Sequence, residues 1–170
     1  MSLEGSVALV TGGGRGVGRA IALGLAEDGA TVAVNYRRDD GAASETVSLI
    51  EAAGGRAKAY QASVDDLEED ELMVNQILDD LGPVSILVNN AGIASRGRMV
   101  ADTDAAELQR VVATHAFGPH YLSRLVLPGM RTLERGDIIM ISSVATRSLG
   151  SHGAPYNMGK TAMEALAYTL

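Results

Sequence analysis

The stretch from Val7 to Gly18 constrains the fold of this chain more than any other. Its first four residues, Val7–Val10, are apolar and uncharged, which is typical of a strand buried on both faces of a parallel sheet. The following turn carries five glycines, and an apolar pattern with helical spacing begins at Ile21. A strand, a glycine-rich turn and a helix in this order present backbone N–H groups to a phosphate. The alternative is a tight turn in which glycine serves geometry alone.

Composition narrows the function classes. The chain has 170 residues, 46% of them hydrophobic, which indicates one globular domain over residues 1–170. A net charge of −7 argues against a nucleic-acid partner, and the lack of cysteine excludes disulfides, thiolate catalysis and cysteine zinc sites. No stretch is typical of a signal peptide or a membrane span. The positions of the three histidines give no reason to expect a metal site. We therefore expect a soluble, cytoplasmic protein without a membrane partner.

Short apolar segments alternate with helical ones along the chain. We expect strands at Val7–Val10, Thr31–Asn35, Ala57–Gln61, Ile86–Val88 and Asp137–Ile141. We expect helices near Gly16–Asp28, Gly41–Ala53, Glu68–Leu81, Ala105–Leu133 and Tyr156–Leu170. Pro128 should kink the fourth of these helices or end its regular part. This alternation predicts the α/β class, with a doubly wound parallel sheet and helices on both faces.

Two arginines follow the second expected strand. In dinucleotide-binding sheets, an acid near this position binds the ribose 2′-hydroxyl of NAD, and an arginine accommodates the 2′-phosphate of NADP. Here Arg37 and Arg38 precede the first acids, Asp39 and Asp40, and Arg15 in the glycine turn adds another positive charge. We favour a 2′-phosphate site. The alternative is that both arginines are solvated loop charges paired with the two aspartates.

Polar residues also end the fourth and fifth expected strands. Asn89-Asn90-Ala91-Gly92 is either part of the ligand crevice or an ordinary turn, and its sequence alone favours neither. Ser142 and Ser143 follow the fifth strand, at the same edge of the sheet. Tyr156 and Lys160 are four residues apart, on one face of a helix. A nearby ammonium stabilises a phenolate, so it would make the tyrosine a usable general acid or base. The alternative is that a tyrosine and a lysine have this spacing by chance.

Taken together, these motifs resemble the short-chain dehydrogenase/reductase family of the classical type. The resemblance rests on Thr11-Gly12-x-x-x-Gly16-x-Gly18, Asn89-Asn90-Ala91-Gly92, Ser143 and Tyr156-x-x-x-Lys160, in family order and spacing across nearly the whole chain. The chain looks most similar to the 3-oxoacyl-acyl-carrier-protein reductases. The fold implied is a Rossmann-type doubly wound parallel sheet that lacks the family's last strands.

The resemblance also implies roles for individual residues. Tyr156 would donate a proton to a carbonyl oxygen, Ser143 would hydrogen-bond that oxygen, and Lys160 would hold the nicotinamide ribose. The cofactor would be NADP(H) rather than NAD(H). Its implied binding residues are Gly12, Arg15, Gly16, Val17, Gly18, Arg37, Ser63, Val64, Asn90, Ala91, Gly92, Tyr156 and Lys160.

Three positions depart from the family pattern. His115 stands where the family usually has a catalytic asparagine, and it either supports proton relay or is a packing residue. Ser63 stands where relatives usually have aspartate, and we expect it still to hydrogen-bond adenine, beside a backbone contact from Val64. The chain ends at Leu170, inside the expected last helix, which leaves the fifth strand as an exposed apolar edge. Either a partner covers this edge or, as we expect, the chain is a fragment of a longer protein.

These observations predict an NADP(H)-dependent oxidoreductase that reduces a small carbonyl, 3-oxoacyl-like or otherwise, to a secondary alcohol. The alternative is a nucleotide-binding or scaffold protein of the same fold without turnover. A flavodoxin-like mononucleotide binder is disfavoured because it leaves Ser143, Tyr156 and Lys160 unexplained. We expect a homo-oligomer, a dimer or tetramer, because relatives commonly assemble through the helices after the fourth and fifth strands.

Overall fold

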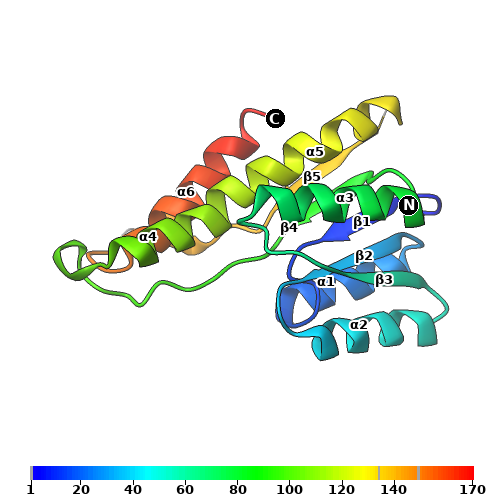
Figure 1. The fold of residues 1–170 in the computed structure, drawn as a ribbon, viewed down its shortest axis with the longest axis horizontal. Coiled ribbons are helices and arrows are strands. Elements are labelled where there is room, and N and C mark those ends of the chain that lie inside the picture. The colour runs from blue at the N-terminus through cyan, green and yellow to red at the C-terminus, as the bar shows by residue number, and fades with distance from the viewer. Residues whose placement is uncertain (1, 134, 149) are drawn as a thin grey trace.

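A parallel sheet organises the protein, as the alternation of strands and helices predicts. The structure is a computed structural model that describes residues 2–133, 135–148 and 150–170. Its five strands stand in the order β3-β2-β1-β4-β5. They are β1 (Val7–Val10), β2 (Thr31–Tyr36), β3 (Arg56–Gln61), β4 (Ile86–Asn89) and β5 (Asp137–Met140). Every neighbouring pair is parallel, which confirms the Rossmann-type fold class (Figure 1).

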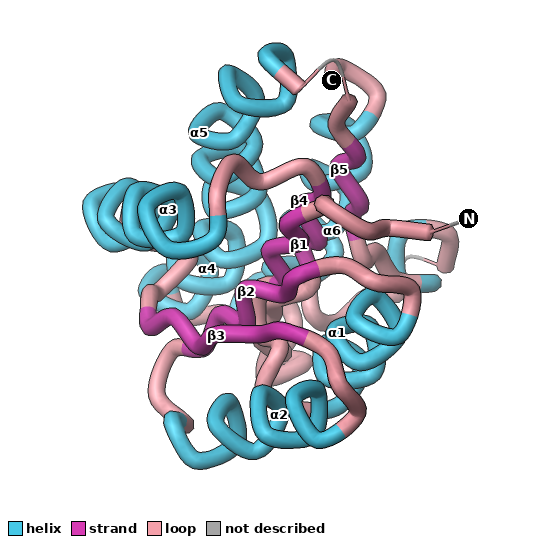
Figure 2. The backbone as a smooth tube through the Cα atoms, turned by 90° about the vertical axis from the view of Figure 1, so that its right-hand side faces the viewer, coloured by secondary structure: helices cyan, strands magenta, loops and turns pink. Residues whose placement is uncertain are grey.

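Helices cover both faces of this sheet. Figure 2 shows α1 and α2 on one side and α3, α4 and α5 on the other. The helices are α1 (Gly16–Glu27), α2 (Asp40–Ala52), α3 (Leu67–Leu81), α4 (Ala105–Val112), α5 (Gly118–Thr132) and α6 (Ala154–Ala167), with short 3₁₀ turns at Val100–Asp102 and Val144–Thr146. In Figure 1, α6 runs alongside α4, against which it packs. No helix in the described ranges has the length and apolar character needed to cross a membrane.

The alternating side chains of the central strands separate two hydrophobic cores. Ala8 and Val10 of β1 pack with Ala22 of α1 and Ile50 of α2. Val7 and Leu9 point the other way, into a core with side chains from α3 and α5 that include Met73, Ile77, Leu122 and Val126. Because side chains alternate along a strand, a strand must be apolar throughout to serve both layers. This explains why the charge-free run Val7–Val10 forms the centre of the sheet.

The long fourth helix differs from its predicted form. Residues 105–132 are helical throughout, but Ala113–Phe117 form a π-helical turn between α4 and α5. Pro128 lies inside α5, which continues to Thr132, so the expectation that it ends the regular helix is wrong. Pro128 has no N–H to donate, so α5 lacks one backbone hydrogen bond at this position while the helix continues. The irregular backbone geometry lies instead in the π-helical turn that contains His115.

Strand β5 lies at the edge of the described sheet, as expected. It pairs with β4, while its outer side has no strand neighbour among the described residues. Ile139 is 44% exposed, whereas the residues of β1 and β4 are all buried. The other strand boundaries agree with the predictions to within one residue.

Candidate functional site

Hydrogen bonds join the glycine turn to the segment after β4. The side chain of Asn90 donates from Nδ2 to the carbonyl oxygen of Thr11 over 2.8 Å. The Thr11 hydroxyl accepts from the backbone N–H groups of Asn90 and Ala91, at 2.9 Å each. Two motifs separated by nearly eighty residues thus form one surface at the carboxyl ends of β1 and β4, where ligands bind in open α/β sheets. This favours the crevice interpretation of Asn89-Asn90-Ala91-Gly92.

Gly18 makes this close approach sterically possible. A Cβ on Gly18 would collide with the carbonyl oxygen of Gly12 and lie 2.5 Å from Nδ2 of Asn90. Gly12 itself has φ +61°, a left-handed conformation that favours glycine. Asn35 adds a polar contact that the sequence did not indicate, because its Oδ1 accepts from the Gly12 N–H over 3.1 Å. Only the fold shows that this buried asparagine at the end of β2 faces the turn.

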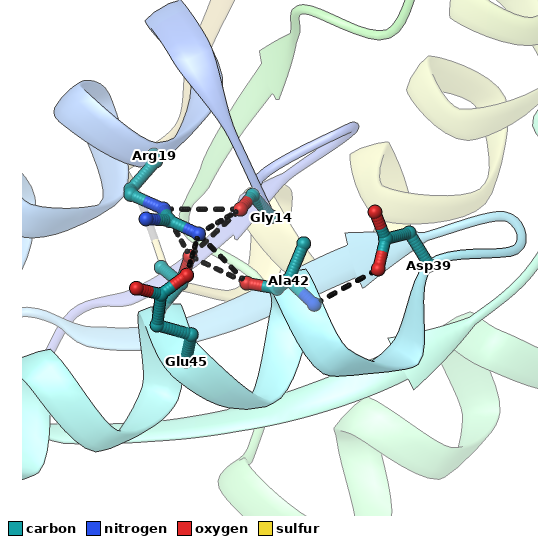
Figure 3. Close-up of polar contacts among 6 residues, drawn as sticks. Gly14, Arg19, Asp39, Ala42 and Glu45 are labelled. Atoms are coloured by element: carbon teal, nitrogen blue, oxygen red, sulfur yellow. Dashed lines mark hydrogen bonds and ion pairs between the residues drawn. The ribbon is translucent and has the colours of Figure 1, made fainter.

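Arg19 connects the glycine turn to α2 (Figure 3). Its guanidinium donates twice to the Gly14 carbonyl oxygen, from Nε over 3.0 Å and from Nη2 over 2.8 Å. It also donates to Ala42 O over 3.2 Å and pairs with Glu45 over 2.6 Å. These bonds direct the Gly14 carbonyl toward α2. Sequence reasoning missed this role, since an arginine within a helix is usually a solvated charge.

A cavity of about 420 Å³ lies over the glycine turn and the ends of β2, β3 and β4. Its lining includes most of the residues predicted to bind cofactor: Gly12, Arg15, Val17, Gly18, Arg37, Ser63, Val64, Asn90, Ala91 and Gly92. Arg38 also lines it. Gly16, with φ +56°, shapes the turn but does not line the cavity.

Ser63 adopts a different arrangement from the predicted one. Its hydroxyl donates to a carboxylate oxygen of Asp65, and its backbone N–H donates to Glu69 over 2.6 Å. Asp65 also lines the cavity, so this chain carries a carboxylate there two residues after Ser63. The sequence contains this signal, Ser63-Val64-Asp65, but spacing alone assigns no role to Asp65.

A second cavity, of about 560 Å³, holds Tyr156 and Lys160. It shares Val17, Asn90, Gly92 and Ile93 with the first cavity, so the two adjoin. His115, Ser142 and His152 also line it. Residues from the glycine turn, the segment after β4, the π turn and α6 therefore meet at one crevice, as the sequence motifs predict.

Lys160 is buried beside Tyr156. Its Nζ donates to the carbonyl oxygen of Ile141 over 2.6 Å and lies 6.0 Å from the centroid of the Tyr156 ring. Burial lowers the pKa of Lys160 to about 8, because desolvation disfavours the charged form. The ammonium therefore remains the predominant form near neutral pH, in reach of the tyrosine.

Ser143 directs its hydroxyl into its own backbone. The Oγ accepts from the N–H of Ala145 over 3.2 Å and so caps the 3₁₀ turn Val144–Thr146. Ser142, not Ser143, is among the residues that line the second cavity. The structure thus brings Tyr156, Lys160 and His115 together and places the Ser143 backbone nearby, with its side chain turned toward the 3₁₀ turn.

His115 is buried against Tyr156. It is 1% exposed, and the two rings meet edge to face with centroids 5.1 Å apart. Its Nε2 lies 2.8 Å from Ile93 O, while Nδ1 is buried without a hydrogen-bond partner among the described residues. Desolvation lowers the pKa of His115, which keeps the ring neutral. A Cβ on Gly92 would lie 2.6 Å from the imidazole ring of His115, and a Cβ on Gly159 would lie 2.8 Å from the Cβ of His115. The two glycines therefore leave space for this histidine.

Glu107 holds the loop that borders this cavity. Its buried carboxylate accepts from the Ser95 hydroxyl over 2.8 Å and from the Arg96 N–H over 2.7 Å. These hydrogen bonds keep the pKa of Glu107 below its usual value. Farther along the loop, Arg98 O accepts from the N–H of Gly153 at the start of α6, over 3.1 Å. The role of Glu107 could not be predicted, because an acid on a helix is usually solvated.

Comparisons with known proteins agree with this geometry. A family model described as short chain dehydrogenase matches residues 6–170. The uncharacterized oxidoreductase YgfF of Escherichia coli is 40% identical over 166 residues, which cover 95% of this chain and 67% of that protein. The acetoacetyl-CoA reductase of Paracoccus denitrificans is 38% identical over 154 residues, covering 91% of this chain and 61% of that one.

A solved structure matches the fold closely. The crystal structure of a metagenomic short-chain oxidoreductase in complex with NADP superimposes with a TM-score of 0.94 at 33% identity. The match covers 99% of this chain and 76% of that chain. The protein described here therefore spans about two thirds of the length of the two curated relatives and three quarters of this structural one.

Proposed function

The chain belongs to the short-chain dehydrogenase/reductase family, and on this premise we propose that it carries the cofactor-binding and catalytic part of an NADP(H)-dependent oxidoreductase. The reaction is the reduction of a ketone, 3-oxoacyl-like or another small carbonyl, to a secondary alcohol. One observation carries the proposal: the cavity over the glycine turn adjoins the cavity that holds Tyr156 and Lys160. The similarity to an acetoacetyl-CoA reductase supports the 3-oxoacyl class of substrate.

The residues over the glycine turn fit a dinucleotide phosphate. Gly18 leaves a space that a Cβ would fill, and the turn leads into the N-terminus of α1, the end of a helix that binds phosphate groups. Arg15 and Arg37 are exposed cations in the cavity lining, suited to a 2′-phosphate. Asp39, the first acid after β2, accepts from Ala42 N over 3.0 Å and caps α2 (Figure 3). Asp39 lines the same cavity, so the proposed preference for a 2′-phosphate rests on the cations Arg15 and Arg37.

The second cavity fits proton transfer to a carbonyl oxygen. When bound, NADPH supplies the hydride that reduces the carbonyl carbon. Tyr156 donates its phenolic proton to the oxygen, which completes the alcohol, and it regains a proton from solvent. Lys160 holds a positive charge beside the phenol and would bind the ribose of the cofactor. Ser143 hydrogen-bonds the same carbonyl oxygen after its hydroxyl turns away from Ala145, and neutral His115 supports the Tyr156 ring from the side.

A second candidate function is a cofactor-binding scaffold without turnover. The orientation of Ser143 favours it, because that hydroxyl caps a backbone N–H rather than lining the cavity. In either case, assembly of a dimer or tetramer would use the surfaces of α4, α5 and α6, which are the helices after the fourth and fifth strands.

Replacing Tyr156 with phenylalanine distinguishes the two candidates. The Tyr156→Phe variant should lose at least about 100-fold in ketone-dependent NADPH oxidation, since general acid catalysis contributes on this order. Its dissociation constant for NADPH, measured by nicotinamide fluorescence, should remain within about threefold of the wild type. Tyr168→Phe is the matched control, because Tyr168 is 84% exposed at the end of the same helix. Equal turnover of wild type and Tyr156→Phe would contradict the proposed mechanism.

A further inference from the structure

The segment after β5 is fastened to α6 at three points. Lys160 donates to Ile141 O over 2.6 Å. The hydroxyls of Ser142 and Thr146 both donate to one carboxylate oxygen of Glu164, Oε1, over 2.6 and 2.8 Å. Ser143 lies between these anchored residues. The position of its backbone is therefore set by side chains of α6.

The anchoring residues share a helix face with Tyr156. Tyr156, Lys160 and Glu164 follow one another at intervals of four residues within α6 (Ala154–Ala167). Residues four apart in an α-helix lie one above the other on the same side. A contact made by Glu164 on this face therefore determines the distance between the Ser143 segment and the Tyr156 ring.

The 3₁₀ turn transmits this contact to Ser143. The Thr146 N–H donates to the Ser143 carbonyl oxygen over 3.2 Å, and the single Thr146 hydroxyl proton is shared between that oxygen, at 2.9 Å, and Glu164 Oε1, at 2.8 Å. Ser143 Oγ in turn accepts from Ala145 over 3.2 Å. The Thr146 hydroxyl thus contacts both Glu164 and the backbone of Ser143, so the turn and the carboxylate form one connected set of hydrogen bonds.

We propose that Glu164 is a positioning residue that holds Ser143 in register with Tyr156. The inference rests on the proposed function, in which these two residues bind the same carbonyl oxygen. Glu164 does not touch that oxygen itself; it acts through Ser142 and Thr146. The hydroxyl donors keep the pKa of Glu164 below its usual value, so the acceptor remains ionised across the neutral range.

The charge of Glu164 matters less than its acceptor oxygen. Both hydroxyls donate to Oε1, while Arg147 approaches the other oxygen, Oε2, only to 4.0 Å. A glutamine retains one oxygen that can accept both hydroxyls, whereas an alanine retains none. Glu164→Gln should therefore preserve the arrangement, and Glu164→Ala should release the segment. Arg147→Ala is the matched control, because it removes the distant ion pair and leaves the hydroxyl contacts.

The test combines hydrogen exchange with kinetics of the purified protein. In Glu164→Ala, amide exchange over residues 141–147 should accelerate on the order of tenfold, because the turn opens more often. The kcat for ketone reduction should fall on the order of 10- to 100-fold, because Ser143 is displaced from the carbonyl oxygen. The NADPH dissociation constant should remain nearly unchanged. Glu164→Gln and Arg147→Ala should stay within about threefold of wild type in both measurements. In a Ser143→Ala background, Glu164→Ala should add little further loss of kcat, since coupled residues are not additive.

Each outcome has a distinct meaning. Unchanged exchange over residues 141–147 in Glu164→Ala would overturn the inference, whatever the activity. Full additivity of Glu164→Ala and Ser143→Ala in kcat would also overturn the inference, because Glu164 would then not act through Ser143. Loss of activity in Glu164→Gln would overturn it as well, because this variant retains the acceptor oxygen. If exchange accelerates as expected but the wild type reduces no ketone, the arrangement stands and the proposed function fails.

Discussion

The two sides of the crevice are held in place in different ways. On the cofactor side, β1 and β4 are buried, β2 is buried except at its two ends, and the glycine turn is held by side-chain hydrogen bonds of Thr11, Asn35 and Asn90. On the catalytic side, β5 is a half-exposed edge, and the segment after it is fixed by Lys160 and Glu164. We therefore expect cofactor binding to depend on the space at Gly18 and on the side chains that hold the turn, and catalysis to depend on the α6 side chains that hold the segment after β5. Substitutions on the two sides should therefore have different effects.

The largest expected effect is that of Gly18→Ala on the cofactor side. Because the added Cβ would collide with the Gly12 carbonyl, the turn must open, and the affinity for NADPH should fall at least about 100-fold. Nicotinamide fluorescence measures this loss, and circular dichroism checks that the chain remains folded.

Gly24→Ala is the control for Gly18→Ala. A Cβ on Gly24 in the same helix meets nothing within 4 Å. The substitution should raise stability by about 0.5–1 kcal/mol through helix propensity and leave NADPH affinity unchanged. Tight NADPH binding by Gly18→Ala would contradict the steric account of the cofactor side.

The next largest effect is a pH dependence confined to the catalytic side. Lys160, with a pKa of about 8, loses its charge above that pH, so kcat/KM for ketone reduction should fall about tenfold per pH unit above pH 8. Binding of adenosine 2′-monophosphate reports on the cofactor side alone. It should be constant from pH 7 to 9, because the arginines remain charged there. Parallel losses in both measurements would show that the two sides are not independent.

A smaller effect is expected for Arg19→Ala. It removes two hydrogen bonds to Gly14 O and leaves the orientation of that carbonyl to Thr46, which donates to it over 3.1 Å. NADPH affinity should fall about tenfold, because the turn loses hydrogen bonds that orient it. A hydrogen bond from a charged group contributes about 1.5–3 kcal/mol, and only part of this is lost from NADPH binding. Titration by fluorescence measures the change, and kcat at saturating NADPH should be unaffected. A fall in kcat at saturation would mean that Arg19 also acts on the catalytic side.

The smallest effect is expected for Glu45→Ala. This substitution removes the exposed partner of Arg19 but none of the bonds from Arg19 to Gly14 or Ala42. Exposed ion pairs contribute about 0–1 kcal/mol, so NADPH affinity should change by less than about threefold. A loss as large as that of Arg19→Ala would show that the ion pair, and not the bonds to the Gly14 carbonyl, supports the turn.

The difference between the cofactor side and the catalytic side also explains how much of the structure could be predicted from the sequence. The strands and the glycine turn followed from the apolar runs and glycines, because buried parallel strands and phosphate turns have a strong local signature. Most of the lining of the cavity over the glycine turn followed from the resemblance to the short-chain dehydrogenase/reductase family. The π turn at His115 and the capping role of the Ser143 hydroxyl had no local signature. The roles of Arg19, Glu107 and Glu164 also escaped prediction. Apart from Gly14, which lies five residues before Arg19, their partners lie from about ten to more than twenty residues away, and only the fold brings them together.

Titration of the wild-type chain with NADPH and with NADH tests the central claim most directly. The account predicts that nicotinamide fluorescence reports NADPH binding at least about tenfold tighter than NADH, the discrimination expected from one charge-assisted contact to a 2′-phosphate. Equal affinities would contradict the role of Arg15 and Arg37. If neither cofactor binds to the folded chain, the proposal that this crevice is a dinucleotide site is wrong.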